Sequence, residues 1–341
     1  MRKLGVAIQG AGWVAGEHIK AFTRNPHTEV VAICSRTQEG AQRKLEETGI
    51  SCAVYDSFDQ VLSDDAVDII SICTPNDLHA DEGIQAARAG KHLLMEKPMA
   101  LTLEDARRLR DAVTEAGVKT VVSFVLRWNP LFETIQALIA DDAVGRVFYA
   151  EVDYYHGIGP WYKQFTWNIR KAIGGSSLLS AGIHAVDGLR WFVQDEVVEV
   201  SALSTRGDGP SFDQYEYDPT EVLIARFAGG AVGKVTSSIE SKMPYVFNIQ
   251  LLGTKGSIRN NQVYARDKYP GQTGFATIPT ILPDSGDVTH HPFQGEIDHL
   301  VDCVLSGRES HASVADAYKT HEICFAADRS AQEGRPVRLP L

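Results

Sequence analysis

Short apolar runs alternate with amphipathic helical stretches along residues 4–124. Apolar and β-branched runs predict strands at residues 4–8, 30–34, 53–55, 67–73, 92–95 and 120–124. Periodic stretches between these runs predict helices at residues 15–24, 39–47, 58–63, 77–89 and 103–116. Strands separated by helices of this length are typical of βαβ units and a parallel sheet. Residues 1–124 are therefore expected to form a doubly wound α/β domain.

The pattern changes after residue 126. It predicts a helix at residues 131–140, a long strand at 147–155 and a second helix at 178–193. Strand-like runs with short turns then follow at residues 197–204, 220–227, 231–239, 247–253 and 256–260. Residues 267–292 are predicted to be a long loop, and helices are predicted again at 294–305 and 314–332. Successive strands with tight turns favour an α+β domain over residues 125–341, with a large, mostly antiparallel open sheet.

Composition narrows the class of protein. The 341 residues are 44% apolar and carry a net charge of −11, which argues against nucleic acid as a partner. No apolar run reaches the roughly 18 residues that span a bilayer, so no membrane partner is expected. The five cysteines form no Cys-x-x-Cys pair, which favours a reducing, cytoplasmic location. The neighbouring His290 and His291 lack acidic or Cys partners at suitable spacing, and no metal site is expected.

A glycine-rich turn follows the first predicted strand. Its sequence, Gly10-Ala11-Gly12-Trp13-Val14-Ala15, fits the GxGxxG/A pattern of dinucleotide-binding sites. The first glycine permits the tight turn, and Gly12 lets the backbone approach a pyrophosphate at the helix N-terminus. The position between a strand and a helix favours dinucleotide binding over a merely structural turn. Gly10, Gly12, Trp13 and Val14 are the expected cofactor contacts.

The end of the second strand bears on the choice of cofactor. NAD-preferring sites usually place Asp or Glu there to bind the ribose 2′-hydroxyl. This chain instead has Ser35 and Arg36, with no carboxylate before Glu39. Arg is a planar, charged donor suited to a 2′-phosphate, so NADP is the favoured cofactor and NAD stays possible. The alternative is that Arg36 is an ordinary solvated residue at a helix start.

Further motifs follow the fourth and fifth strands and recur later in the chain. They are Cys73-Thr74-Pro75-Asn76-Asp77-Leu78-His79, Glu96-Lys97-Pro98, Gly174-Gly175-Ser176, Gly182-x-His184-x-x-Asp187 and Gly334-Arg335-Pro336-Val337. In this order, and with the glycine loop, they resemble the Gfo/Idh/MocA oxidoreductases over nearly the whole chain. The set is specific for the family and nearly silent on the substrate.

The resemblance implies a Rossmann domain, an open-sheet α/β domain and an active site in the cleft. It implies that the cofactor also contacts Thr74, Pro75, Asn76, His79, Glu96, Lys97 and Arg127. Lys97, at the carboxyl end of a parallel strand, would stabilise a developing alkoxide. The resemblance also implies a cis bond at Pro98. Without the family resemblance, the neighbouring Glu96 and Lys97 would be interpreted as an ordinary surface ion pair.

The predicted helix at residues 178–193 carries a second set of candidates. Ser180, His184, Asp187 and Trp191 are spaced to share one helical face, and the opposite face is largely apolar. His184 is suited to accept a hydroxyl proton, although a hydrogen-bonded core histidine is the plain alternative. Many family members have Asp where this chain has Ser180, so inositol dehydrogenase specificity does not carry over directly.

An aromatic stretch at residues 154–170 supplies further substrate candidates. Aromatic faces stack on sugars, and polar or charged tips select hydroxyls or a carboxylate. The same residues would equally suit a domain junction or a subunit interface. The expected substrate contacts are Asn129, Tyr155, Trp161, Trp167, Arg170, Ser180, His184 and Asp187, with His156 and Lys163 as weaker candidates.

These features predict an NAD(P)-dependent oxidoreductase. It would transfer hydride between nicotinamide and a secondary alcohol or ketone of a sugar, polyol or sugar derivative, with Lys97 and His184 as catalytic residues. Two rivals stay open: a redox-assisted glycoside-cleaving enzyme with tightly bound cofactor, and a non-enzymatic dinucleotide sensor. Retention of Lys97 and His184 argues against the sensor. The open sheet leaves one face to cover, so a homodimer or homotetramer is expected.

Overall fold

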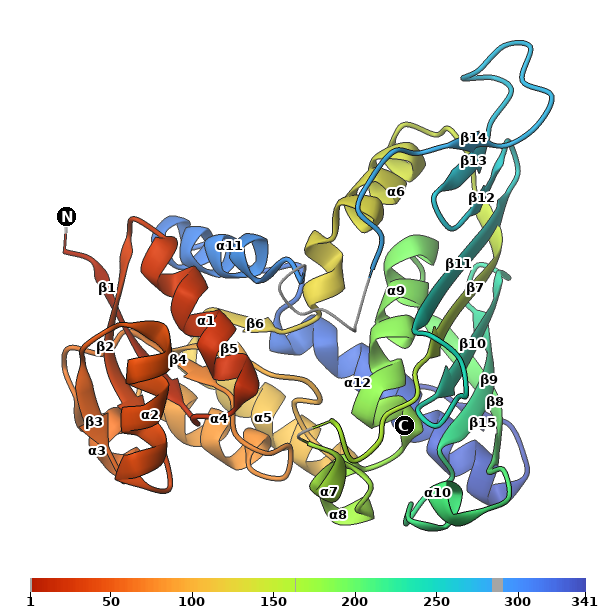
Figure 1. The fold of residues 1–341 in the computed structure, drawn as a ribbon. Coiled ribbons are helices and arrows are strands. Elements are labelled where there is room, and N and C mark those ends of the chain that lie inside the picture. The colour runs from red at the N-terminus through yellow and green to blue at the C-terminus, as the bar shows by residue number, and fades with distance from the viewer. Residues whose placement is uncertain (1, 163, 284–290) are drawn as a thin grey trace. The chain divides into compact units, whose positions relative to one another are not determined.

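The chain divides into two compact units. The computed structural model describes residues 2–162, 164–283 and 291–341 (Figure 1). The first unit comprises the chain through Val125 and also Pro292–Tyr318. The second comprises the described residues of Leu126–His291 and Lys319–Leu341. Residues Pro292–Tyr318 thus belong to the first unit although they follow most of the second unit in the chain, and no pattern in the sequence predicts this.

The first unit is built on a six-stranded parallel sheet. Its order is β3-β2-β1-β4-β5-β6, and neighbouring strands pair in parallel. The strands are β1 (Leu4–Gln9), β2 (Thr28–Cys34), β3 (Ala53–Tyr55), β4 (Ile69–Ile72), β5 (His92–Met95) and β6 (Thr120–Val122). This is the predicted Rossmann topology. The strand order reverses between β1 and β4, where such sheets bind ligands at the carboxyl edge.

Helices connect these strands close to the predicted positions. They are α1 (Trp13–Arg24), α2 (Gln38–Thr48), α3 (Phe58–Ser63), α4 (His79–Arg88) and α5 (Leu103–Ala116). α5 shows why the prediction works: Thr102 caps its N-terminus by accepting a 3.1 Å hydrogen bond from Asp105 N, and its apolar positions are buried. A 3₁₀ turn, η1 (Val125–Trp128), follows β6.

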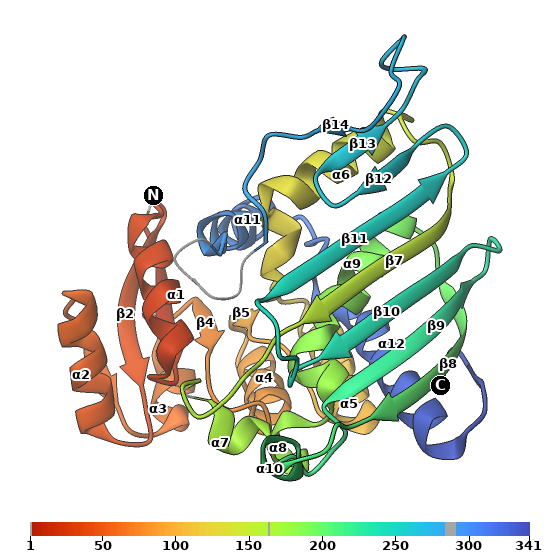
Figure 2. The ribbon, with the colours of Figure 1, turned by 45° about the vertical axis from the view of Figure 1, so that its right-hand side comes forward.

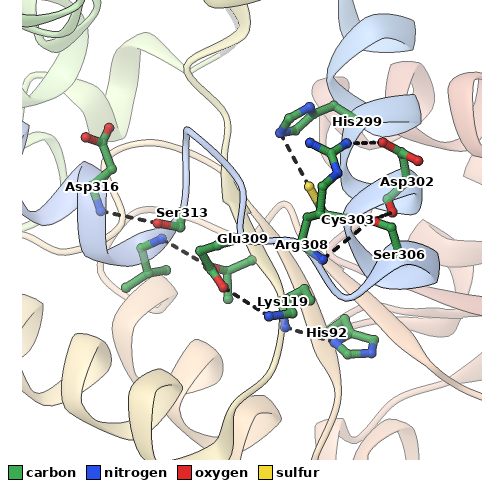
Figure 3. A network of polar contacts seen from close by, with 12 residues as sticks. His92, Lys119, His299, Asp302, Cys303, Ser306, Arg308, Glu309, Ser313 and Asp316 are labelled. Atoms are coloured by element: carbon green, nitrogen blue, oxygen red, sulfur yellow. Dashed lines mark hydrogen bonds and ion pairs between the residues drawn. The ribbon is translucent and has the colours of Figure 1, made fainter. Parts of the chain in front are cut away.

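Helix α11 (Phe293–Ser306) packs beside α1 in the first unit. Figure 3 shows side chains from α11 and its following loop near the start of β6. The Lys119 ammonium lies 3.2 Å from the Glu309 carboxylate, and Lys119 N donates to His92 Nδ1 over 3.0 Å. In β6, Val122 N also donates a main-chain hydrogen bond to Ala312 O in the segment Pro292–Tyr318 (2.8 Å). These contacts attach the returning segment to the parallel sheet.

The second unit is built on the predicted open sheet, seen face-on in Figure 2. Its order is β14-β13-β12-β11-β7-β10-β9-β8-β15, and only β7 and β10 pair in parallel among the described strands. The strands are β7 (Val147–Tyr155), β8 (Val197–Thr205), β9 (Thr220–Phe227), β10 (Val232–Ser238), β11 (Val246–Gly253), β12 (Ser257–Arg259), β13 (Gln262–Tyr264), β14 (Ala276–Thr277) and β15 (Val337–Arg338). The prediction of one loop over residues 267–292 is wrong at β14, which pairs with β13.

Helices α9 (Ile183–Val193) and α6 (Pro130–Ala140) lie on one face of this sheet (Figure 2). The same unit contains the single turns α7 (Phe165–Asn168), α8 (Lys171–Gly174) and α10 (Pro210–Asp213). α9 packs on β7 and β10 through buried residues such as Val186 and Leu189. α12 (Val314–Glu333) begins in the first unit and continues into the second.

The predicted continuous helix at residues 178–193 is wrong in its first turn. η2 (Leu178–Gly182) is a π-helical turn, and α-helical geometry begins only at Ile183. The turn lies against β10, where Ser177 Oγ and Ser237 Oγ are 2.7 Å apart. A π turn holds more residues than an α turn, so the spacing argument that placed Ser180 on the His184 face does not apply.

Candidate active site

The glycine turn lies at the carboxyl end of β1, beside the end of β4. Gly10 has a φ of +104°, and a Cβ there would lie 2.6 Å from Cys73 O, so the fold itself requires glycine. A Cβ at Gly12 would lie 3.6 Å from the same oxygen, an ordinary contact. The chain's own packing therefore does not demand glycine at position 12, which fits the close approach of a ligand.

The N-terminus of α1 suits an anion. Gly12 is its N-cap residue, no side chain caps it, and its first turn has no acidic residue. Gly12 and Trp13 are exposed and Val14 is half-buried. An uncapped helix start presents its N–H groups and the positive end of the helix dipole, the arrangement that binds pyrophosphate. The residues present therefore fit a dinucleotide.

Glu82, which the sequence prediction missed, ties the two loops of this edge together. Its carboxylate accepts hydrogen bonds from Gln9 Nε2 (2.7 Å) and Thr74 Oγ1 (2.6 Å). Burial raises the pKa of Glu82, and the two hydrogen bonds oppose that shift. Thr74, predicted to contact cofactor, thus has a structural partner on α4, one helical turn beyond His79. No sequence motif signals this contact.

His79 is fully buried and connects two motif loops. Its Nδ1 lies 2.8 Å from Pro98 O, and its Nε2 lies 2.8 Å from Thr74 O. Carbonyl oxygens only accept, so both ring nitrogens must carry hydrogen for both contacts to be hydrogen bonds. The ring therefore fixes the Thr74 loop against the Glu96-Lys97-Pro98 turn. Between them, Pro75 is exposed and Asn76 is buried.

The residues that bear on cofactor choice follow β2. Ser35 N donates to Tyr55 O (3.2 Å), which places Ser35 at the carboxyl edge of the sheet. Arg36 is exposed, and Thr37 caps α2 by accepting from Gly40 N. These placements are compatible with either a 2′-hydroxyl or a 2′-phosphate.

The Glu96-Lys97-Pro98 turn follows β5 at the same edge. The bond between Lys97 and Pro98 is cis, as the resemblance implied. Burial lowers the pKa of the Lys97 amine, and the Glu96 carboxylate opposes that shift. Glu96 Oε1 lies 3.3 Å from Nε2 of the buried His18. Glu96 and Lys97 are half-buried, and the fully buried His18 lies directly behind the Glu96 carboxylate.

In the second unit, two candidates pair with each other. The Arg127 guanidinium makes two hydrogen bonds to the Asp187 carboxylate, from Nε (2.7 Å) and Nη2 (2.5 Å). Their side chains are 1% and 3% exposed. Thr320 Oγ1 also donates to Asp187 (3.1 Å), and Arg127 lies over the Trp191 ring. The structure thus gives both residues structural partners, and their predicted ligand contacts stay predictions.

Ser180 and Asn129 also have structural partners. Ser180 Oγ donates to Asn168 Oδ1 over 2.6 Å, and Tyr217 donates to Asn168 O over 2.7 Å. Asn129 caps α6 by accepting from Leu131 N (2.9 Å). Asn168 and Tyr217 were missed by sequence reasoning because they lie 12 and 37 residues from Ser180.

His184 lies in the first turn of α9. Across residues 183–189, all of which are described, it alone is not buried. Its half-buried ring can therefore meet a ligand, unlike its neighbours on the helix. The alternative of a hydrogen-bonded core histidine stays open, and the acid/base role of His184 stays a prediction.

The aromatic stretch forms a ring cluster at the end of β7. His156 makes edge contacts with Trp161 (5.8 Å between centroids) and Tyr245 (5.6 Å). Trp161 is 65% exposed, and Tyr155 and Trp167 are half-buried.

The charged candidates of this stretch are placed differently. Arg170 is exposed and pairs with Glu216 over 2.7 Å. Lys163, like His290, lies outside the described residues. Within the described ranges, no cluster of three or more His, Cys, Asp or Glu side chains could hold a metal ion. None of the helices in the described parts of the chain is long and apolar enough to cross a membrane.

Comparison with known proteins agrees with this geometry. Residues 4–124 match the model described as "Oxidoreductase family, NAD-binding Rossmann fold", and residues 132–259 match the GFO/IDH/MocA C-terminal domain. The chain is 27% identical to scyllo-inositol 2-dehydrogenase (NAD(+)) of Bacillus subtilis, over 98% of this chain and 96% of the relative.

It is also 27% identical to levoglucosan dehydrogenase of Pseudarthrobacter phenanthrenivorans, over 82% of this chain and 81% of the relative. A solved structure of levoglucosan dehydrogenase with NADH and L-sorbose superposes with a TM-score of 0.89 at 25% identity, over 100% of both chains. Both family domains are present in order, and together they cover most of the chain. The chain belongs to the GFO/IDH/MocA family of oxidoreductases.

Proposed function

We propose that the chain transfers hydride between NAD(P) and a secondary alcohol or ketone of a sugar, polyol or sugar derivative. The observation that carries the proposal is the carboxyl edge of the first unit's sheet. It holds an uncapped helix start after Gly10 and, two strands away, Lys97 with a lowered pKa. The relatives named for scyllo-inositol and levoglucosan support cyclic polyols and anhydrosugars as the first substrates to test.

The proposed roles follow from the chemistry of each side chain. The bound cofactor supplies a hydride acceptor at nicotinamide C4. Oxidation of the alcohol breaks one C–H and one O–H bond, and His184 takes the hydroxyl proton. The Lys97 ammonium stabilises the negative charge that develops on the oxygen. Trp161 and Trp167 hold the substrate ring by stacking.

The decisive experiment compares Lys97→Met and His184→Gln with the unaltered protein. Each substitution should lower kcat by at least about 100-fold while NADH still binds. Lys119→Met is the matched control, because Lys119 precedes β6 at the opposite end of the sheet and pairs with Glu309. Full activity in Lys97→Met, or no turnover of any polyol or sugar by protein that binds cofactor, would overturn the proposal.

For the cofactor, we propose that Arg36 binds the 2′-phosphate of NADP. The exposed guanidinium directly after β2, with no neighbouring carboxylate before Glu39, supports this choice. Titrations followed by the fluorescence of Trp13, which is 39% exposed, would compare NADPH with NADH. NADPH should bind more tightly, and Arg36→Ala should weaken NADPH about tenfold without changing NADH. Tighter binding of NADH by the unaltered protein would contradict this assignment.

We further propose a homodimer or homotetramer that covers the outer face of the second unit's sheet. Three apolar side chains share this face on paired positions of β8 and β9: Leu203, Val222 and Ile224. Leu203 is 75% exposed and Ile224 is 54% exposed, more than a solvated sheet face usually leaves. Light scattering should show an oligomer that Ile224→Lys dissociates; a monomeric unaltered protein would contradict it.

A further inference from the structure

A buried histidine lies behind the Glu96-Lys97-Pro98 turn. His18, from α1, has no exposed surface. Its Nε2 is 3.3 Å from Glu96 Oε1, and its Nδ1 is 2.8 Å from Ser71 Oγ and 3.3 Å from Cys73 Sγ. The Glu96 carboxylate also lies 3.3 Å from Lys97 N through its other oxygen. His18 thus meets the carboxylate that adjoins the proposed catalytic lysine.

A second carboxyl group reaches the same cluster from α11. Glu296 is fully buried, and one of its oxygens accepts a 3.1 Å hydrogen bond from Ser123 Oγ. Its other oxygen accepts no hydrogen bond from the described residues. Phe293, one turn earlier on α11, contacts the His18 ring edge-on at 5.2 Å between centroids. The returning segment Pro292–Tyr318 therefore packs against His18 and Ser123, behind the turn.

The groups in this cluster differ in charge. Burial opposes a charged imidazole, but Cys73 and Glu96 outweigh it and raise the pKa of His18 well above its usual value. Burial also opposes a charged Glu96, yet His18, Lys97 and His79 together hold its pKa below the usual range. Burial raises the pKa of Glu296 to about 8, with His18 lowering it and the Glu96 charge adding to the rise.

Glu96 therefore lies as a carboxylate between His18 and Lys97, and burial favours the protonated form of Glu296 on α11. Two ionised carboxylates in one buried cluster would repel each other strongly. Three further polar side chains contact this cluster: Ser71 and Cys73, at the end of β4, contact His18, and Ser123, after β6, donates to Glu296.

We propose that His18 and Glu296 are positioning residues for the hydride transfer proposed above. His18 holds the Glu96 carboxylate in place. Glu296, as a neutral acid that accepts a hydrogen bond from Ser123, adds no second negative charge to the cluster. Together they keep the Lys97 amine in one position and one charge state. The inference rests on the proposed function, and neither residue touches substrate or cofactor in this account.

The first test removes the cation behind Glu96. In His18→Gln, Glu96 acts on Lys97 without competition, so the alkaline limb of the kcat profile should move up by about one pH unit. A displaced lysine should also lower kcat about tenfold at neutral pH while KM for the nicotinamide cofactor stays the same. An unshifted profile with unchanged kcat would overturn the role of His18.

The second test separates a neutral acid from a carboxylate at Glu296. Glu296→Gln keeps a neutral hydrogen-bonding group of the same size and should retain at least about half of kcat, whereas Glu296→Leu should lose about tenfold. Equal losses in both variants would show that Glu296 acts as a carboxylate. Retained kcat in Glu296→Leu would show that it has no positioning role. The matched control is Glu221→Gln, a buried acid of the second unit, which should leave the pH profile unshifted.

A spectroscopic test needs no turnover. The infrared spectrum of the unaltered protein at neutral pH should contain a protonated carboxyl band that Glu296→Gln removes. Glu333→Gln, which replaces an exposed carboxylate whose pKa is lowered by Arg329, should leave that band in place. Absence of that difference contradicts a neutral Glu296 whether or not the protein is active. Conversely, if the band is present but no polyol or sugar is oxidised, the proposed function fails while the charge assignment of Glu296 stands.

Discussion

The two units fix their functional side chains by different means. In the first unit, the candidates lie on turns at strand ends, and main-chain groups hold several of them: Gly10 N donates to Cys34 O, and His79 contacts two carbonyl oxygens. In the second, side-chain pairs do this work, chiefly Arg127 with Asp187 and Ser180 with Asn168. Main-chain groups are the same in most residues, so support by them depends on few residue identities. A buried side-chain pair is lost when either member is substituted.

The largest expected effect comes from breaking the pair in the second unit. Arg127→Met leaves the Asp187 carboxylate buried without its partner and should cost about 3–5 kcal/mol of unfolding free energy. The double variant Arg127→Met/Asp187→Leu should recover much of this loss. Arg170→Met, which breaks the exposed pair with Glu216, should cost less than about 1 kcal/mol. Urea denaturation measures all three, and equal costs for the two single variants would contradict the account.

The next effect concerns the pH dependence of stability in the first unit. The pKa of Glu296 is raised to about 8 in the folded state by burial, so the folded state binds a proton that the unfolded state has released above its ordinary pKa. Stability should therefore fall as pH rises toward 8, by about 2–3 kcal/mol for each two pH units. Glu296→Gln should make this slope shallower by about 1.4 kcal/mol per pH unit, measured as unfolding free energy between about pH 5.5 and about pH 7.5. A variant with the same slope as the unaltered protein would contradict the prediction.

Two glycines of one turn should behave differently. Gly10→Ala places a Cβ against Cys73 O at a φ of +104° and should cost about 1–2 kcal/mol or more of stability. Gly12→Ala meets only an ordinary contact, so stability should change by less than about 0.5 kcal/mol while NADH binding weakens about tenfold. Thermal unfolding and NADH titration separate the two effects. Unweakened binding in Gly12→Ala would remove the argument for a pyrophosphate there.

The smallest effect is expected at Tyr217. Its hydroxyl donates to Asn168 O, next to the amide that holds Ser180. Tyr217→Phe removes this hydrogen bond and should cost about 1 kcal/mol of unfolding free energy. NADH binding, which depends on the first unit, should not change. A loss of NADH affinity at constant stability would contradict the expectation that Tyr217 contributes to stability and not to cofactor binding.

The same difference explains what the sequence could predict. The strands of the first unit, its glycine turn and the position of Lys97 follow from periodicity and motif spacing, because each depends on neighbours in the chain. The mostly antiparallel sheet of the second unit was also predicted. The π turn at Leu178–Gly182 could not be read from residue types that suit an α-helix equally well.

Contacts between distant residues account for the rest. Nothing in the sequence pairs His18 with Glu96 or brings Glu296 beside Ser123, since 78 and 173 residues separate the partners. Arg127 and Asp187 were each identified from motif position, but their mutual pairing depends on how α9 packs on the sheet. Buried acids such as Glu82 and Glu296 look in sequence like ordinary solvated residues of amphipathic helices.

The proposed activity is hydride transfer between a nicotinamide cofactor and a cyclic polyol or sugar, with Lys97 at the reacting oxygen. The most direct measurement follows nicotinamide absorbance when the purified protein is mixed with NAD or NADP and, in turn, inositols, levoglucosan and aldoses. Lys97→Met is measured in parallel. The account predicts reduction of the cofactor with at least one substrate and its loss in Lys97→Met. Substrate oxidation that survives unchanged in Lys97→Met, or cofactor binding without any turnover, would contradict it.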